Sequence, residues 1–536
     1  MKLNRKDVLD RDFWQGARVT LPTFDLERMA QATAAHPVWL HFGAGNIFRG
    51  FIATLQQELL DRGLAEEGII AVDSFDDDII DRIYRPHDNL SLLVHLCPDG
   101  STRRRVVAGV ADSLKADEAG MRKLRVLFER PSLQLVSFTI TEKGYALKNA
   151  QGEFFPVVLE DLEAGPTEVR HTVSMVTALL LGRYRAGGDP LALVSMDNCS
   201  RNGEKLQAAV WTVAKAWAER GKVPAGFLAY LSDPERVSFP WSMIDKITPR
   251  PAEEVGETLA ADGIEGMQAI VTGRNTYIAP FVNAELPQYL VIEDAFPNGR
   301  PALEKVGVYL TDRDTVNRTE GMKVMTCLNP LHTALAIFGC LLGYRRIAAE
   351  MEDPLLRELV CRIGYGEGMP VVVDPGIIDP KAFLDEVIAQ RLPNPFIPDS
   401  PQRIATDTSQ KMSVRFGETI KAYLADEALD PGTLTCIPLV IAGWIRYLLG
   451  YDDQGEVMEI SADPLLSSLQ DQLAGLVPGQ PLLRLSDKLL PVLQNKNIFG
   501  LDLVRAGLSG KISDMFAGMM AGPGSVRSTL AAYLQK

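Results

Sequence analysis

Cysteine and histidine are scarce in this 536-residue chain, and neither is grouped as a metal site or a disulfide framework requires. The six cysteines form no CxxC pair, and the six histidines show no HExxH or similar spacing. We therefore expect a reduced protein without metal, in which the cysteines are small buried hydrophobic residues. The cysteines are Cys97, Cys199, Cys327, Cys340, Cys361 and Cys436.

An excess of positive charge and long apolar runs are lacking as well. The net charge of −14 and the pI near 5.1 argue against nucleic acid and anionic membranes as partners. The opening stretch MKLNRKDVLDRDFW is charged and has no apolar signal-peptide core. The longest apolar run, around 334–342, is too short to span a membrane and predicts a buried helix. We expect a cytoplasmic protein in which an anionic substrate would need a local cationic pocket.

Two patterns of secondary structure divide the chain, which is too long for one ordinary domain. Up to about residue 300, strands alternate with helices, which predicts an α/β fold with a doubly wound, mostly parallel sheet. Beyond that point, segments with helical periodicity are separated by turns that carry proline and glycine. We expect a nucleotide-binding domain over residues 1–300 and a mostly α-helical domain over residues 301–536.

A glycine-bearing turn follows the first predicted strand. Gly43, Gly45 and Gly50, with Asn46 among them, form G-x-G-x-x-x-x-G, which lets a backbone approach a pyrophosphate at a helix N-terminus. The spacing is two residues longer than the usual one, so an ordinary structural turn is the alternative. Asp73 ends the next strand, where an acid would bind an adenosine ribose and repel a 2′-phosphate. Together they predict NAD rather than NADP.

The stretch EGMKVMTCLNPLH (320–332) places three polar side chains, Lys323, Asn329 and His332, in an apolar run. Burying such groups costs free energy unless they pair, and a buried lysine gives up its proton more readily than an exposed one. Each residue also has an ordinary explanation. Lys323 could extend its ammonium to solvent, Asn329 could cap a helix that begins at Pro330, and His332 could be a core histidine.

Several motifs occur in an order that resembles the long-chain, zinc-independent mannitol dehydrogenase family of polyol and sugar-acid dehydrogenases. Within that family the chain is most similar to the fructuronate reductases (D-mannonate oxidoreductases), over roughly residues 35–450. The resemblance implies a Rossmann domain, a helical domain and an active site between them. The motifs are GAGNIFRG (43–50), TEKGY (141–145), MDN (196–198), SFPWSMIDKITP (238–249), the 320–332 stretch and RIATDTSQK (403–411).

The resemblance also implies roles for individual residues. Hydride transfer between nicotinamide and a secondary alcohol carbon requires a proton to move at the oxygen. The family implies a lysine for that proton, two asparagines that hold the oxygen, and a histidine for substrate binding. Cationic side chains could bind a substrate carboxylate, although they could equally be surface cations. The implied residues are Lys323, Asn198, Asn329 and His332, with Asp245, Arg403 and Lys411 at further active-site positions.

The chain departs from the family pattern at two points. Six positions separate Lys323 from Asn329, where the family has five, and Trp241 stands where asparagine is common. Because Pro330 has no N–H for the carbonyl of Thr326, we predict a π-bulge or a break that absorbs the extra residue.

The expected substrate is a small sugar acid, with fructuronate and mannonate as the predicted pair. Tagaturonate reduction, polyol oxidation and a catalytically silent NAD-binding sensor are the alternatives, and the chain could be a monomer or a small homo-oligomer.

Overall fold

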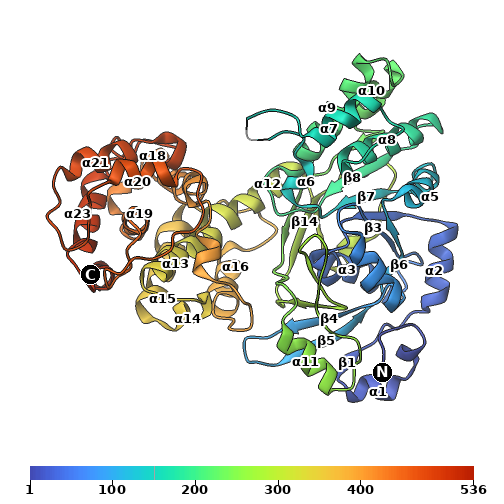
Figure 1. The fold of residues 1–536 in the computed structure, drawn as a ribbon, viewed down its shortest axis with the longest axis horizontal. Coiled ribbons are helices and arrows are strands. Elements are labelled where there is room, and N and C mark those ends of the chain that lie inside the picture. The colour runs from blue at the N-terminus through green and yellow to red at the C-terminus, as the bar shows by residue number, and fades with distance from the viewer. Residues whose placement is uncertain (150, 536) are drawn as a thin grey trace. The chain divides into compact units, whose positions relative to one another are not determined.

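The computed structural model describes residues 1–149 and 151–535, and the chain divides into two units, Met1–Asn317 and Arg318–Lys536 (Figure 1). The onset of helical periodicity predicts a domain boundary near residue 300. The first unit continues past that point, because the chain still adds a strand at Tyr309–Thr311 before the helices of the second unit begin. Each unit is described by itself.

A six-stranded parallel sheet forms the centre of the first unit, in the order β6-β3-β2-β7-β8-β9. This is the order of a doubly wound dinucleotide-binding fold, with the switch point at β2, between β3 and β7. The predicted fold class is therefore confirmed. The strands are β2 (Trp39–Phe42), β3 (Ile69–Asp73), β6 (Val110–Lys115), β7 (Leu135–Phe138), β8 (Leu191–Ser195) and β9 (Val237–Ser238).

Side chains alternate along these strands, so both faces of the sheet are covered. Leu40 and Phe42 belong to one core, which they share with α5 (Glu118–Phe128), α8 (Thr172–Arg185) and α9 (Asn202–Glu219). Trp39 belongs to the other core, which includes α3 (Ala53–Asp61). Figure 1 shows α8 and α9 lying beside β7 and β8. The other helices of this unit are α1 (Arg11–Gly16), α2 (Leu26–Ala35), α4 (Asp77–Ile79), α6 (Thr141–Tyr145), α7 (Pro156–Ala164), α10 (Ala225–Ser232) and α11 (Glu253–Ala261).

Further strands lie outside the main sheet and were not predicted. One sheet has the order β1-β5-β4-β13, a second has the order β10-β14-β15, and β11 pairs with β12 as a hairpin. Their residues are β1 (Val19–Thr20), β4 (Ser91–Leu96), β5 (Thr102–Val107), β10 (Ser242–Asp245), β11 (Ile270–Val271), β12 (Tyr277–Ile278), β13 (Phe281–Ala284), β14 (Tyr289–Glu293) and β15 (Tyr309–Thr311).

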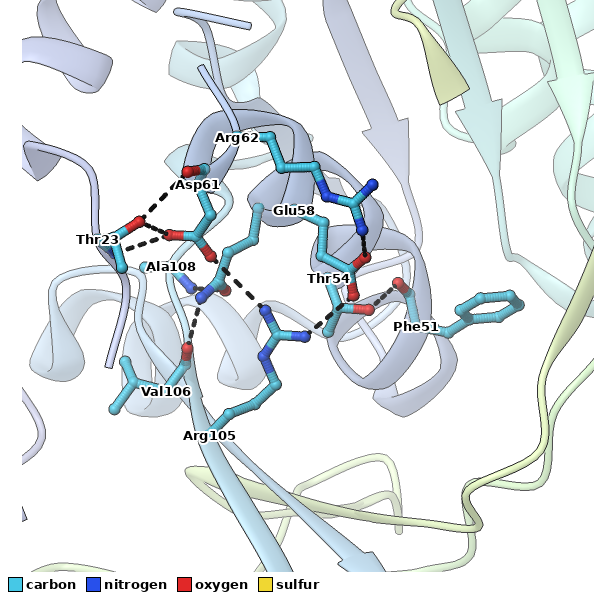
Figure 2. A network of polar contacts seen from close by, with 10 residues as sticks. Thr23, Phe51, Thr54, Glu58, Asp61, Arg62, Arg105, Val106 and Ala108 are labelled. Atoms are coloured by element: carbon cyan, nitrogen blue, oxygen red, sulfur yellow. Dashed lines mark hydrogen bonds and ion pairs between the residues drawn. The ribbon is translucent and has the colours of Figure 1, made fainter. Parts of the chain in front are cut away.

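Polar contacts fasten α3, the helix that follows the glycine turn, to β5, as Figure 2 shows. The Arg105 guanidinium lies 3.3 Å from the Glu58 carboxylate and 3.8 Å from the Asp61 carboxylate. The Asp61 carboxylate also accepts hydrogen bonds from the backbone N–H of Thr23 at 2.7 Å and from its hydroxyl at 2.8 Å. The helix behind the glycine turn is thus held by two separate segments of the first unit.

The second unit is helical, and within its described residues the only strand-like pairing is a bridge between Tyr451 and Val457. Its core forms where α19 packs against α13 and α23. The helices are α13 (Asn329–Leu341), α14 (Ile347–Glu352), α15 (Pro354–Cys361), α16 (Pro380–Glu386), α17 (Pro401–Ile404), α18 (Glu418–Ala425), α19 (Cys436–Tyr447), α20 (Leu466–Leu473), α21 (Leu485–Leu493), α22 (Lys496–Phe499), α23 (Ser509–Met519) and α24 (Ser525–Leu534).

A helical stretch that is interrupted at Leu328 runs over Arg313–Leu341, beginning with α12 (Arg313–Gly321). By length and composition alone it could cross a membrane, since the mean hydropathy of its most apolar window is 1.5. However, 78% of that window is buried inside the protein, which is the behaviour of a core helix. The predicted buried helix around 334–342 lies within this stretch.

Candidate active site

The three glycines of the turn after β2 have three different roles. Gly43 has φ of +104°, and a Cβ there would lie 2.2 Å from the carbonyl oxygen of Thr139, so no other residue fits. At Gly45 a Cβ would meet nothing within 4 Å, which leaves the backbone open to a ligand. At Gly50 a Cβ would lie 2.9 Å from the side chain of Val282, so this glycine serves packing.

The long spacing of the glycines has a structural explanation. The helix that leaves the turn passes through a π-helical turn at Phe48–Ile52 before α3 begins. A π-helical turn accommodates one residue more than an α-helical turn. Gly50 lies within it and packs against Val282, so the π-helical turn accounts for one of the two additional residues before the third glycine.

Two buried polar side chains near the glycine turn, Arg49 and His41, were not predicted to have a role. Arg49 is 1% exposed; its guanidinium donates to the carbonyl oxygen of Ala279 at 2.7 Å and to Oδ1 of Asn46 at 2.9 Å. His41 is fully buried between the hydroxyls of Ser137 and Thr139, at 2.6 and 2.8 Å. Burial lowers the pKa of His41 to about 3, so the ring is neutral.

Asp73 is where the sequence predicted an acid, at the end of β3, but it is only 8% exposed. One carboxylate oxygen accepts the backbone N–H groups of Phe75 and Asp76, at 2.9 and 2.8 Å. The other accepts the N–H of Ala44 in the glycine turn at 3.1 Å. Burial raises the pKa of Asp73, while these bonds act in the opposite direction. The second oxygen has capacity for one more donor, and ribose binding there stays a prediction.

Asn198 and Asp245 lie on segments that are tied together within the first unit. Asn198 is exposed in the loop after β8, whereas Asp245 is 6% exposed at the end of β10. Asn202 joins the two segments: its amide donates to the carbonyl oxygens of Asp197 at 3.0 Å and of Ser242 at 2.9 Å. It also accepts the N–H of Ser242 at 3.0 Å. The loop of Asn198 and the strand of Asp245 therefore share one rigid connection.

In the second unit, the predicted distortion between Lys323 and Asn329 is confirmed. Met322–Cys327 forms a π-helical turn in which the N–H of Leu328 donates to the carbonyl oxygen of Lys323, five residues back, at 3.1 Å. Lys323 is 1% exposed, so its side chain is buried.

The alternative role of Asn329 as a helix cap is wrong by one position. Leu328 occupies the N-cap and Asn329 is the first residue of α13. Pro330 is therefore the second residue of α13, where the first was expected. A proline fits there as well, because the first N–H groups of a helix have no partner within it.

His332 and Arg403 converge on one carboxylate, that of Asp399. Nε2 of His332 lies 3.0 Å from one oxygen, and Nε and Nη2 of Arg403 donate to the other at 2.9 and 2.6 Å. Burial alone would raise the pKa of Asp399, but His332 and Arg403 outweigh burial and hold the pKa below its usual value. Asp399 lies outside every motif, so nothing in the sequence pointed to it.

Lys411 belongs to a group of cations in the segment that follows α17. Its ammonium donates to the carbonyl oxygen of Thr406. Partial burial and the nearby charge of Arg415 lower the pKa of Lys411, while Asp407 acts to raise it. Arg415 donates to the hydroxyl of Thr333 on α13, and burial lowers its pKa to about 10. The structure thus brings Lys411 close to a second cation that the sequence analysis missed.

Comparison with known proteins decides which family this is. The mannitol dehydrogenase Rossmann domain matches residues 38–305, and the mannitol dehydrogenase C-terminal domain matches residues 315–520. The chain belongs to the mannitol dehydrogenase family. The resemblance drawn from the ordered motifs is therefore confirmed.

Relatives within the mannitol dehydrogenase family extend over the whole chain. A D-mannonate oxidoreductase of Thermotoga maritima is 52% identical over 534 residues, covering 99% of this chain and 98% of the relative. The solved ternary complex of Pseudomonas fluorescens mannitol 2-dehydrogenase with NAD and D-mannitol is 28% identical, with a TM-score of 0.73 and full coverage of both chains. A substrate-free D-sorbitol dehydrogenase structure is 26% identical, with a TM-score of 0.80, covering 96% of this chain and 98% of that one.

Proposed function

We propose that the protein is an NAD-dependent oxidoreductase that interconverts D-fructuronate and D-mannonate. The observation that carries this proposal is the 52% identity to a D-mannonate oxidoreductase over 99% of the chain. The reaction acts on a secondary CH–OH group, and the residues present suit both the cofactor and a sugar-acid substrate.

The residues of the glycine turn fit a dinucleotide. Gly43 permits the sharp turn after β2, and the open space at Gly45 leaves room for a pyrophosphate against the backbone. Asp73 lies at the adjoining strand end and holds the N–H of Ala44. When bound, NAD accepts or supplies the hydride. The carboxylate of Asp73 favours NAD over NADP, because it would repel a 2′-phosphate.

The protein's own part in the chemistry is the proton and the orientation of the substrate. Burial disfavours the charged form of a lysine, so Lys323 is suited to exchange a proton with the substrate oxygen. Asn198 in the first unit and Asn329 in the second each carry an amide that can donate to a substrate oxygen without titrating. His332, held at Nε2 by Asp399, can use its other ring nitrogen toward a substrate hydroxyl. The buried carboxylate of Asp245 can accept from another hydroxyl.

A carboxylate on the substrate is favoured by the cations of the second unit. Lys411 and Arg403 are positive groups in a chain whose net charge is −14. An interaction with a desolvated carboxylate is worth on the order of 2–4 kcal/mol, or roughly a hundredfold in kcat/KM. A polyol is the second candidate substrate, because Asp399 already neutralises part of the charge of Arg403.

A panel assay tests the proposed function. The protein is incubated with NADH and D-fructuronate, D-tagaturonate, D-fructose and other ketoses, and oxidation is followed at the nicotinamide absorbance band. We expect D-fructuronate to be reduced roughly a hundredfold more efficiently than D-fructose. Lys411→Met should remove most of that difference. Lys421→Met, whose ammonium pairs with Glu418, is the matched control and should leave the difference intact. Equal efficiency with fructose in wild type would refute the sugar-acid assignment.

A further inference from the structure

One buried carboxylate in the first unit, that of Asp197, links the MDN motif (196–198) to the TEKGY motif (141–145). Asp197, in the loop after β8, is 8% exposed. One of its oxygens accepts the N–H of Thr141 at 2.9 Å. The other accepts the N–H of Ile140 at 3.0 Å and the hydroxyl of Tyr145 at 2.5 Å. All three donors belong to the segment that follows β7, so Asp197 ties the ends of two neighbouring strands together.

The segment held by Asp197 is strained. Thr141 has φ of +64°, in the left-handed region that a β-branched residue rarely adopts. Such a conformation costs on the order of 1–3 kcal/mol and persists only where the surroundings impose it. The two backbone N–H groups at this point open α6, where no earlier turn of helix can accept them. The carboxylate of Asp197 accepts both, and thereby stabilises the strained conformation.

Tyr145 completes the arrangement from the other end of α6. Its hydroxyl lies 2.8 Å from Oγ of Ser195 on β8, in addition to its bond to Asp197. Burial, followed by the charge of Asp197, raises the pKa of Tyr145 well above its ordinary value, so it remains a neutral donor.

The position of Asp197 in the chain gives this arrangement a consequence for the reaction. Its carbonyl oxygen accepts the N–H of Cys199 at 2.9 Å and the amide of Asn202 at 3.0 Å. Its side chain is buried while that of the next residue, Asn198, is exposed. Five hydrogen bonds therefore fix the residue from which the Asn198 side chain extends.

We propose that Asp197 is a positioning residue for the reaction: its carboxylate locks the strained turn at Thr141 and thereby fixes the loop that presents Asn198. The proposal rests on the proposed function, which gives Asn198 its role at the substrate oxygen. A displacement of about 1 Å at a reacting centre can lower turnover about a hundredfold. The lock acts on the orientation of Asn198, whereas the glycine turn keeps supports of its own, in the bond from Ala44 to Asp73 and the bond from Arg49 to Asn46.

The protonation state of Asp197 should also determine the pH below which the enzyme loses activity. Burial raises the pKa of Asp197, whereas the hydroxyl of Tyr145 and the two N–H groups lower it. The titratable and charged groups on the elements around this cluster include Tyr145 and Glu142 on α6, Cys199 on the loop of Asp197, and Lys205 on α9, which pairs with Glu142. Protonation of Asp197 would convert one acceptor oxygen into a donor and release the turn. Removing the Tyr145 hydroxyl therefore shifts the loss of activity at low pH to a higher pH.

Three variants test the proposal: Asp197→Asn, Tyr145→Phe and, as a matched control, Ser195→Ala, which removes only the other contact of Tyr145. In Asp197→Asn we expect kcat to fall at least a hundredfold, with the Kd for NADH within threefold of wild type. In Tyr145→Phe we expect a three- to tenfold fall in kcat and an acid limb moved to higher pH. Ser195→Ala should leave the acid limb in place.

The contrary results are equally specific. An Asp197→Asn enzyme with kcat within threefold of wild type would overturn the proposal. If that variant does not fold, an unmoved acid limb in Tyr145→Phe overturns it instead. If wild type reduces no member of the substrate panel, the proposed function fails separately. The lock is then read from amide hydrogen exchange at Ile140 and Thr141, which should accelerate in Tyr145→Phe relative to Ser195→Ala; equal exchange rates would refute the lock.

Discussion

Glu350, on α14, is a fully buried carboxyl whose two oxygens have no hydrogen-bond partner among the described residues. It lies against Gly339 of α13, where a Cβ would come within 2.1 Å of Oε1. Burial, then the nearby charges of Asp399 and Asp353, raise the pKa of Glu350 from 4.5 to about 9. The side chain is therefore protonated in the folded protein at neutral pH and ionised in the unfolded chain.

This difference makes the stability of the second unit depend on pH. Between pH 4.5 and about 9 the folded state holds a proton that the unfolded state has lost. The free energy of unfolding therefore falls as pH rises, by about 1.4 kcal/mol for each pH unit. At pH 7 the accumulated cost is about 3 kcal/mol. Glutamine has nearly the same shape and does not titrate, so Glu350→Gln removes this cost.

Urea unfolding of wild type and Glu350→Gln at pH 5, 6, 7 and 8 measures the effect. We expect the variant to be more stable by less than about 1 kcal/mol at pH 5 and by about 3 kcal/mol at pH 7, the gap widening with pH. Glu427→Gln, at an exposed position, is the control and should show no such trend. A difference that does not change with pH, or a variant less stable than wild type at pH 8, would refute the reasoning.

Four further substitutions probe the glycine turn and the carboxyl beside α13. Asp73→Ala should weaken NADH binding, because the N–H of Ala44 loses its acceptor, and it should narrow the preference for NADH over NADPH. Fluorescence titration with both cofactors measures the two affinities. If wild type bound NADH and NADPH equally well, the role of Asp73 would be contradicted. Gly45→Ala should fold normally yet bind NADH at least tenfold more weakly, whereas Gly43→Ala should lower the melting temperature as well, since its Cβ would meet the Thr139 carbonyl. Gly339→Ala should lower the melting temperature by several degrees, because the new methyl displaces Glu350; an unchanged value would mean that this contact is loose.

The sequence predicted those parts of the molecule that depend on local pattern. Alternating apolar strands and helices gave the doubly wound sheet, and the change in periodicity gave a separate helical part. The extra residue between Lys323 and Asn329, together with the N–H that Pro330 lacks, predicted a π-bulge or a break, and the structure has a π-helical turn at Met322–Cys327. In each case the signal lies within a few residues of the feature that it specifies.

Features that depend on distant residues were not predictable in this way. Asp399 approaches His332 from a loop 67 residues further along the chain, and no local pattern marks it. Asp197 was part of a quoted motif, yet its partners lie more than 50 residues earlier. Strand β5 carries TRRRVV, in which exposed residues at one end give way to buried residues at the other, so no period-two pattern marks it as a strand. Long-range partners are set by the packed fold, so they emerged only with the structure.

The central claim of the proposed mechanism is that Lys323 exchanges a proton with the substrate oxygen. A comparison of wild type with one variant tests it most directly. Wild type and Lys323→Ala are mixed with NADH and D-fructuronate, with and without small primary amines, and turnover is followed at the nicotinamide band. We predict that the variant binds NADH as wild type does, loses about 10²–10⁴-fold in kcat, and is partly rescued by amines. Turnover of Lys323→Ala within tenfold of wild type would contradict the account.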